Sequence, residues 1–262
     1  MSVRIASVRE RGLPNGWRDM VRQLTLFASA YLGYRLIAGR LPARTGTASA
    51  FHHASQVISL ERTLHIFVEP QIQAWAAHSH LLLTIAAYVY LNAQTTLIVG
   101  ALLYIYFAHN RSYYFVRNMM MVAMAIALVC YALYPTAPPR FLPEWGFLDT
   151  NQIVTGFTSG TAANYFVVQY AAIPSMHIGV AAMLAWPLAR LVRPRPLKLL
   201  WALWPLIITF VTIITGNHFF LDAVLGFATA GVAAVAARRL AVIRPHAWGL
   251  EPRPSSSSVG AA

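Results

Sequence analysis

Six long apolar stretches, separated by polar segments, constrain the fold of this chain more than any other feature. They lie at residues 23–39, 83–107, 112–134, 175–192, 199–217 and 219–239. About 20 helical residues cross the ~30 Å hydrocarbon core of a bilayer. The sequence therefore predicts an all-α fold, a polytopic membrane helix bundle of about six transmembrane helices.

The stretch at 23–39 is short and carries Arg35 within it. A cleaved signal peptide is the alternative interpretation, but no small-residue cleavage site follows the apolar run, so we expect a membrane helix. A further segment, 59–75, has apolar residues at helical spacing with charged residues opposite. This pattern predicts an interfacial amphipathic helix rather than a span.

The composition agrees with a membrane protein. The chain is 58% hydrophobic and only 11% charged, whereas soluble domains are typically about a quarter charged. Its single cysteine, Cys130, lies in an apolar run. A disulfide framework and a metal site built from cysteines are therefore excluded.

The formal net charge is +12, and the basic residues flank the apolar stretches. With six spans, fifteen basic residues fall on the side of the N-terminal tail and four on the other side. Because basic residues accumulate on the cytoplasmic side of membrane proteins, segment 135–173 is expected to face away from the cytoplasm. We attribute the charge to topology and anionic lipid rather than to nucleic acid.

We expect a single folded domain. Residues 1–18 are predicted to form a disordered cytoplasmic tail, 19–245 a single transmembrane catalytic domain, and 246–262 a second disordered tail. Frequent alanine and arginine indicate a bacterial source, so the expected location is the bacterial cytoplasmic membrane. The sequence makes no prediction of the oligomeric state.

Two short stretches carry polar residues to the predicted outer face. In AAIPSMHIGVAAM (171–183), Ser175 is expected to cap the helix that begins there, and His177 lies in its first turn. Free N–H groups at a helix start favour anions. In TGNHFFLD (215–222), His218 and Asp222 have the i, i+4 spacing that brings two side chains together on one helical face.

An ionisable residue in apolar surroundings has a cost, roughly 2.5–3.5 kcal/mol on insertion scales, and usually has a function. Asp222 can accept a hydrogen bond from one ring nitrogen of His218 and leave the other nitrogen basic. A purely structural His–Asp pair is the alternative. The second histidine, His177, on the same predicted face favours an active site.

These residues resemble a known family. Pro174-Ser175-Met176-His177 followed by Asn217-His218-x-x-x-Asp222 looks like two motifs of the type-2 phosphatidic acid phosphatase superfamily of lipid phosphatases and phosphotransferases. The segment YPTAPPRFLPEWGFLDT (134–150) resembles its inositol phosphorylceramide synthase-like branch, the inositolphosphotransferases. The resemblance runs from about residue 60 to 230.

The resemblance implies metal-independent transfer of a phosphate-bearing group from a lipid, without a cofactor. His218 would be the nucleophile and form a phosphohistidine, and Asp222 would orient it. His177 would protonate the leaving oxygen and then activate the acceptor, which is water or a polyol such as inositol. Ser175, Asn217 and nearby N–H groups would contact phosphate oxygens.

The chain departs from the superfamily pattern in the residues that clamp phosphate. The first motif, Lys-x6-Arg-Pro, is absent, and Val211-Thr212 stands where a Ser-Arg pair is expected. Arg140 lies on the predicted outer face and is the best replacement. Arg117 matches a family position, but the topology puts it near the cytoplasmic end, so we expect it to snorkel or pack between helices.

Two other classes of function fit the same residues. His177, His218 and Asp222 could bind a metal as two histidines and one carboxylate. A transporter could instead use the His–Asp pair in a proton path at mid-bilayer depth. The clustering of both histidines at one predicted face favours the phosphotransfer enzyme.

Overall fold

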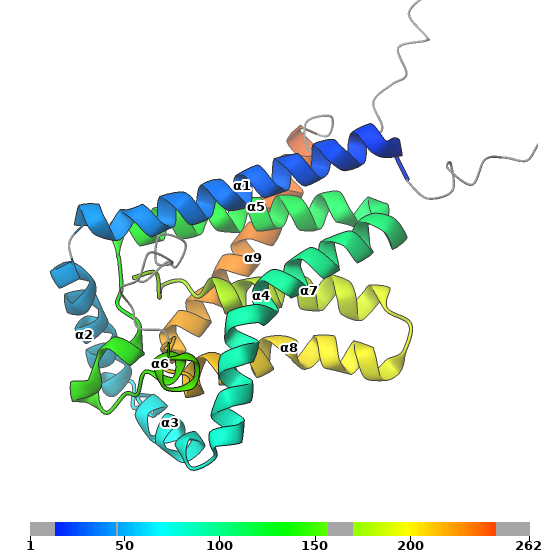
Figure 1. The fold of residues 1–262 in the computed structure, drawn as a ribbon. Helices are drawn as coiled ribbons and strands as arrows, with labels where there is room; N and C mark the ends of the chain where they lie inside the picture. The colour runs from blue at the N-terminus through cyan, green and yellow to red at the C-terminus, as the bar shows by residue number, and fades with distance from the viewer. Residues whose placement is uncertain (1–13, 46, 157–169, 245–262) are drawn as a thin grey trace, which may run out of the picture.

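A computed structural model describes residues 14–45, 47–156 and 170–244, and these residues are mainly helical (Figure 1). The α-helices are α1 (Gly16–Thr45), α2 (Thr47–Thr63), α3 (Glu69–Ala77), α4 (His80–Ala108), α5 (Asn110–Leu133), α6 (Thr150–Thr155), α7 (Met176–Leu191), α8 (Arg195–Ile214) and α9 (Phe220–Ile243). Two 3-10 turns lie at Pro139–Phe141 and Pro143–Trp145. The all-α fold class is confirmed.

Each of the six predicted spans corresponds to a helix, although the helices differ in length and apolarity. Among the described residues, α5, α8 and α9 are long and apolar enough to cross a membrane. The two parts of α4 are inclined by 53° and give a fourth span if they count as one. Helix α7 is apolar but has 16 residues, and α1 has 30. The number six therefore stays a prediction.

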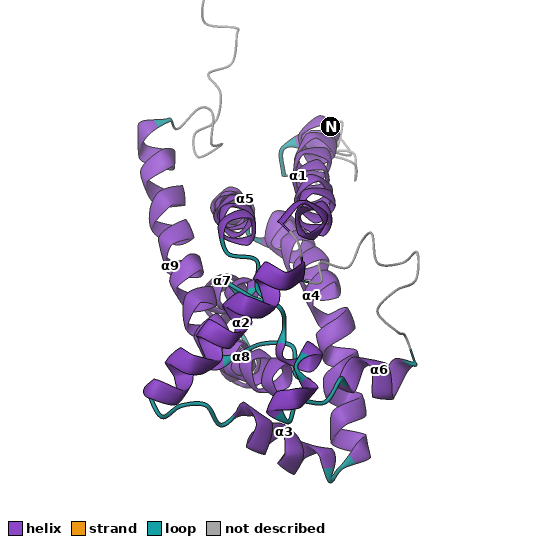
Figure 2. Ribbon diagram, turned by 90° about the vertical axis from the view of Figure 1, so that its left-hand side faces the viewer, coloured by secondary structure: helices purple, strands orange, loops and turns teal. Residues whose placement is uncertain are grey.

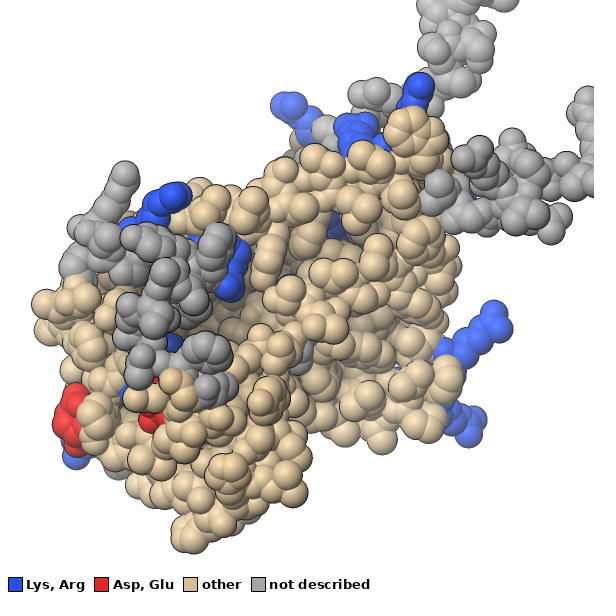
Figure 3. All heavy atoms as spheres, in the orientation of Figure 1, with Lys and Arg blue, Asp and Glu red and all other residues tan. Residues whose placement is uncertain are grey.

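The helix ends divide the bundle into two poles. Helices α2, α3 and α6 gather at one pole, and Figure 2 looks onto it. The α4–α5 and α7–α8 turns lie at the other pole (Figure 1). The α7–α8 turn carries the exposed side chains of Arg193, Arg195 and Lys198, and basic atoms project there in Figure 3.

The predicted amphipathic helix at 59–75 is wrong as a single element. Helix α2 ends at Thr63 and α3 begins at Glu69, with Pro70 in its first turn. Proline lacks an N–H donor and has a fixed φ, so it starts a helix more readily than it continues one. The acidic side chains were expected to face solvent, but Glu61 and Glu69 are fully buried.

The main core lies where α1, α4, α5, α7 and α9 meet. Its fully buried side chains include Ile105, Val116 and Ala233. Leucine and valine side chains on the outer surfaces of α4, α8 and α9 are exposed, as a lipid-facing surface requires. Helix α1 begins at Gly16, within the predicted N-terminal tail. Residues 1–13 and the predicted tail 246–262 lie outside the described residues.

Candidate active site

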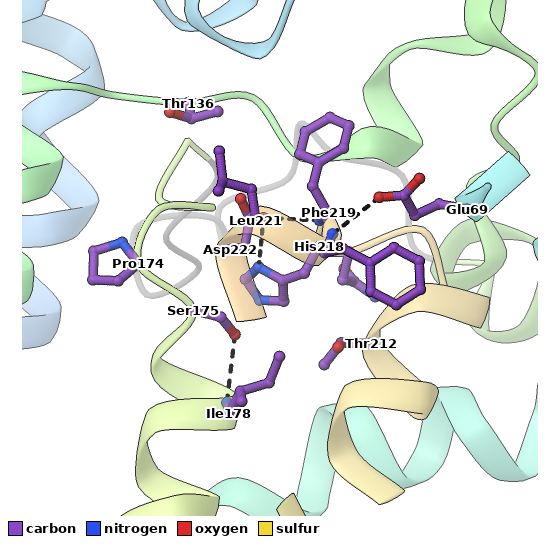
Figure 4. A network of polar contacts seen from close by, with 12 residues as sticks. Glu69, Thr136, Pro174, Ser175, Ile178, Thr212, His218, Phe219, Leu221 and Asp222 are labelled. Atoms are coloured by element: carbon purple, nitrogen blue, oxygen red, sulfur yellow. Dashed lines mark hydrogen bonds and ion pairs between the residues drawn. The ribbon is translucent and has the colours of Figure 1, made fainter. Parts of the chain in front are cut away.

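His218 and Asp222 are in contact, but their geometry differs from the predicted one. His218 lies in the turn before α9 rather than on a helical face, because α9 begins only at Phe220. Asp222 is in the first turn of α9, and its side chain folds back toward the helix start (Figure 4). Its Oδ2 atom lies 3.1 Å from Nδ1 of His218 and accepts the N–H of Phe219 at 2.9 Å.

The turn that holds His218 is fixed by its backbone. The carbonyl oxygen of Thr212 accepts the N–H groups of Asn217 and His218, at 2.9 and 3.3 Å. Gly216 has φ +67°, and a Cβ atom there would lie 2.8 Å from Nε2 of Gln73. Only glycine combines this left-handed backbone with so close a contact. The imidazole is therefore set at the end of α8 by a rigid turn.

Two more carboxyl groups hold the start of α9. Oε1 of Glu69 accepts the N–H of Phe220 at 2.9 Å, and Oε1 of Glu61 accepts the N–H of Leu221 at 2.7 Å. A helix start leaves such N–H groups without helical partners, and its positive dipole favours acidic groups. Figure 4 shows the Glu69 carboxyl directed at this helix end. Glu61 of α2 and Glu69 of α3 thus fix the position of the helix start that carries Asp222 and follows His218.

The surroundings of Glu61 favour its protonated form. Burial and a hydrogen bond to the neighbouring carboxyl of Glu69 raise the pKa of Glu61 to about 9. At neutral pH it therefore keeps a proton that it can share with Glu69.

The second histidine begins α7. Ser175 Oγ accepts the N–H of Ile178 at 3.4 Å, which confirms the predicted helix cap. The rings of His177 and His218 lie 5.8 Å apart between centroids, at 57°. Tyr90 of α4 stacks on His177 with a centroid distance of 4.3 Å. The structure therefore brings together one imidazole from α7 and one from the α8–α9 turn.

Close packing of α7 on α9 makes this meeting possible. A Cβ atom on Gly226 would lie 2.6 Å from the carbonyl oxygen of Ser175, and one on Gly179 would lie 3.2 Å from that of Gly226. The N–H of Ser175 also donates to the carbonyl oxygen of Asp222 at 3.2 Å. The two backbones approach so closely that a side chain at Gly226 would force them apart.

Both imidazoles line a cavity of about 230 Å³, which we call the histidine cavity. Its polar lining residues are Tyr31, Tyr34, Arg35, Tyr90, Gln94, Tyr131, Arg140, His177, Asn217 and His218. Ser175 is buried and does not line it. Contact of Ser175 with a phosphate oxygen therefore stays a prediction, and the capping role is the one that the geometry supports.

Arg140 and Asn217 line the histidine cavity beside His218, the candidate nucleophile. The Arg140 guanidinium donates to Oδ1 of Asn217, and Asn151 donates to the same oxygen at 3.1 Å. The backbone N–H of Arg140 donates to the carbonyl oxygen of Gly216 at 2.7 Å. This contact joins segment 135–149 to the turn that holds His218.

The electrostatic setting of His218 favours a neutral ring. Burial and the positive charge of Arg140 lower the pKa of His218 well below its usual range, while the carbonyl of Ala172 acts in the opposite direction. A neutral imidazole can donate one ring N–H to Asp222 and keep a lone pair on its other nitrogen. The ring is therefore in the state that a nucleophile needs.

Arg117 is far from this site, as expected. It is buried in α5 and donates to Gln23 of α1 and to Oδ1 of Asn118. Tyr131, fourteen residues further along α5, lines the histidine cavity, and this is about 20 Å along a helix. Arg117 packs α1 against α5.

Sequence reasoning missed several of these residues. The aromatic wall of Tyr34, Tyr90 and Tyr131 comes from three different helices and has no common motif. Glu61 and Glu69 are fully buried, whereas the amphipathic pattern of segment 59–75 predicts that they lie on its polar side. Within the described residues, no group of three or more His, Cys, Asp or Glu side chains is arranged to hold a metal ion.

Comparison with known proteins supplies one match. A family model described as the PAP2 superfamily matches residues 55–236, which is more than half of the chain. The match includes α3 to α8 and both histidine stretches, but it begins after α1. Searches of curated proteins and of solved structures found no match.

Proposed function

This chain belongs to the PAP2 superfamily, and we propose that it transfers the phosphate-bearing group of a membrane lipid through a phosphohistidine at His218. Membership of the family indicates a phosphatase or phosphotransferase type of enzyme that acts on lipid phosphates. One observation carries the finer proposal. Two imidazoles from α7 and the α8–α9 turn lie 5.8 Å apart beside one cavity, and one of them is hydrogen-bonded to a buried carboxyl group.

In the first step, Nε2 of His218 attacks phosphorus, an N–P bond forms, and the P–O bond to the leaving group breaks. Asp222 accepts the Nδ1–H of His218 and stabilises the positive charge that develops on the ring. His177 gives a proton to the leaving oxygen. General acid catalysis of this kind contributes about 10²–10⁴-fold to a rate.

In the second step, His177 removes a proton from the acceptor, whose oxygen attacks phosphorus as the N–P bond breaks. His218 then returns to its neutral form. Water as acceptor gives a phosphatase, and an alcohol gives a phosphotransferase. We propose inositol or another polyol as acceptor, because segment 134–150 resembles the inositol phosphorylceramide synthase-like branch and the cavity wall is rich in hydroxyl groups.

We further propose that the site faces away from the cytoplasm of a bacterium. His177 lies in the first turn of α7 and His218 in the α8–α9 turn, and these helix ends lie away from the α7–α8 turn (Figure 1), which is marked by exposed basic residues. The positive-inside tendency places that turn in the cytoplasm. A lipid headgroup at the outer interface is then at the depth of the helix starts.

The test uses purified full-length protein in detergent with a panel of lipid phosphates and phosphoinositides, each with and without inositol. Release of free phosphate identifies a phosphatase, and formation of a new phosphodiester identifies a transferase. His218→Asn should abolish either product. The proposal fails if wild-type protein forms neither product, or if the His218→Asn variant keeps full activity.

A further inference from the structure

Helix α1 forms part of the histidine cavity although it lies outside the residues that match the family model. The match begins at residue 55, whereas α1 ends at Thr45. Tyr31, Tyr34 and Arg35 of α1 line the cavity with His177 and His218. Helix α1 therefore adds two tyrosines and an arginine to the cavity from outside the matched residues.

The cavity wall is positive. Arg35 and Arg140 both line it, and its described lining residues include no carboxylate. Both guanidinium groups are close enough to His177 and to Tyr90 to act on them electrostatically. A cavity with this lining attracts an anion that carries more than one negative charge.

Arg35 is also an unusual residue for its position. It lies within the apolar stretch 23–39, four residues before its end, is half-buried, and lines the cavity. Ionisable residues within membrane helices are costly, and they usually face the bundle interior or a water-filled cavity that serves function. Membrane insertion alone gives no reason to keep a guanidinium here.

Tyr131 of α5 connects α1 to the start of α7. The hydroxyl groups of Tyr34 and Tyr131 lie 3.4 Å apart, and the Tyr131 hydroxyl donates to the carbonyl oxygen of Pro174 at 3.1 Å. Pro174 is three residues before His177. Arg35 follows Tyr34 in the helix, so these contacts fix its backbone relative to the imidazole.

We propose that Arg35 is a substrate-binding residue that contacts the phosphate group attacked by His218, together with Arg140. This inference rests on the proposed function. A phosphate ester has several equivalent oxygens, and guanidinium groups bind them through charge-assisted, often paired, hydrogen bonds. α1 would thus supply a cation that a chain without this helix would lack.

The experiment compares Arg35→Gln with Arg40→Gln in the full chain. Arg40 lies on the same helix, is exposed and does not line the cavity, so it controls for loss of positive charge on α1. The readouts are KM and kcat for the best lipid phosphate, and the inhibition constant for orthovanadate, a phosphate analogue. For Arg35→Gln we expect KM and this inhibition constant to rise roughly tenfold or more, with Arg40→Gln within about twofold of wild type.

A binding measurement separates weaker anion binding from misfolding. Orthovanadate should raise the Tm of wild type and of Arg40→Gln, and should raise that of Arg35→Gln much less. If Arg35→Gln does not purify as folded protein, Arg35→Met keeps the apolar stem and gives the same comparison. Equal vanadate binding by wild type and the folded Arg35 variant overturns the inference.

The two proposals fail in different ways. If wild-type protein neither hydrolyses nor transfers any lipid phosphate, the proposed function is wrong. If wild type is active and Arg35→Gln matches Arg40→Gln in every readout, the function stands and the role of Arg35 is wrong.

Discussion

Oδ2 of Asp222 lies 3.1 Å from Nδ1 of His218 and also accepts the N–H of Phe219. One carboxyl oxygen thus orients the imidazole and closes the first turn of α9. The proposed catalytic pair is therefore part of the start of α9, and its geometry depends on the residues that hold that start in place.

Asp222→Asn should reduce kcat by about 10²–10⁴-fold, because an amide cannot stabilise the charge that develops on His218. The amide oxygen can still accept the N–H of Phe219, so Tm should change little. Steady-state kinetics and a thermal melt in detergent measure both. Asp19→Asn is the control, since Asp19 hydrogen-bonds Tyr106 and Tyr114 at the other pole. Equal loss of kcat in both variants would contradict the role of Asp222.

Gly226→Ala should abolish activity and lower Tm, because the added Cβ would lie 2.6 Å from the carbonyl oxygen of Ser175 and separate α7 from α9. Gly231→Ala is the matched control on the same helix, where no atom lies within 4 Å of the added carbon. Alanine there should stabilise α9 by up to about 1 kcal/mol. Full activity of Gly226→Ala would show that the close approach does not set the distance between the histidines.

Glu61 should make stability depend on pH. Burial beside Glu69 raises the pKa of Glu61 to about 9 in the folded state, against 4.5 for a solvent-exposed glutamic acid. Between these values the folded state holds a proton that the unfolded state releases, so the free energy of unfolding falls as pH rises. Thermal melts at pH values from roughly 5 to 9, between the two pKa values, should show a Tm that falls as pH rises.

The variants of Glu61 separate its charge from its hydrogen bonds. Glu61→Gln can accept the N–H of Leu221 and donate to Glu69, so it should keep activity and flatten the pH dependence. Glu61→Ala leaves both partners unsatisfied, at a cost of about 1–3 kcal/mol, and should lose activity. A flat pH profile in wild type, or identical behaviour of the two variants, would refute this account of the pair.

Chelation tests the rival metal hypothesis. His218 Nδ1 and Asp222 Oδ2 are already engaged with each other, so phosphate chemistry here is expected to continue in excess EDTA, and orthovanadate should inhibit it. Activity before and after dialysis against chelator is the measurement. Loss of activity that returns with a divalent cation would favour a metal enzyme built on the same residues.

The sequence predicted the local parts of the site well. The apolar stretches gave the helices, Ser175 was expected as a helix cap, and the pairing of His218 with Asp222 followed from their spacing. The reason for that pairing was wrong, because His218 precedes α9. An i, i+4 pair can meet across a helix start as well as along a helix face.

Features that depend on tertiary packing could not be predicted from one sequence. In the sequence Glu61 and Glu69 resemble the polar side of an interfacial helix, but in the structure they accept N–H groups at the start of α9. Arg35 interrupts an apolar run, and only the packing of α1 shows that it reaches the histidines. In each case a polar residue in apolar sequence was the visible signal, and its partner lay more than a hundred residues away.

The central claim is that His218 becomes covalently phosphorylated. The direct measurement is to mix the protein with a lipid substrate radiolabelled in phosphate, quench with alkaline denaturant, and locate the label by peptide mass spectrometry. We predict an alkali-stable, acid-labile label on His218 of the wild type during turnover, and no label in the His218→Asn variant. Label on another residue, or full activity with no labelled protein during turnover, would contradict the account.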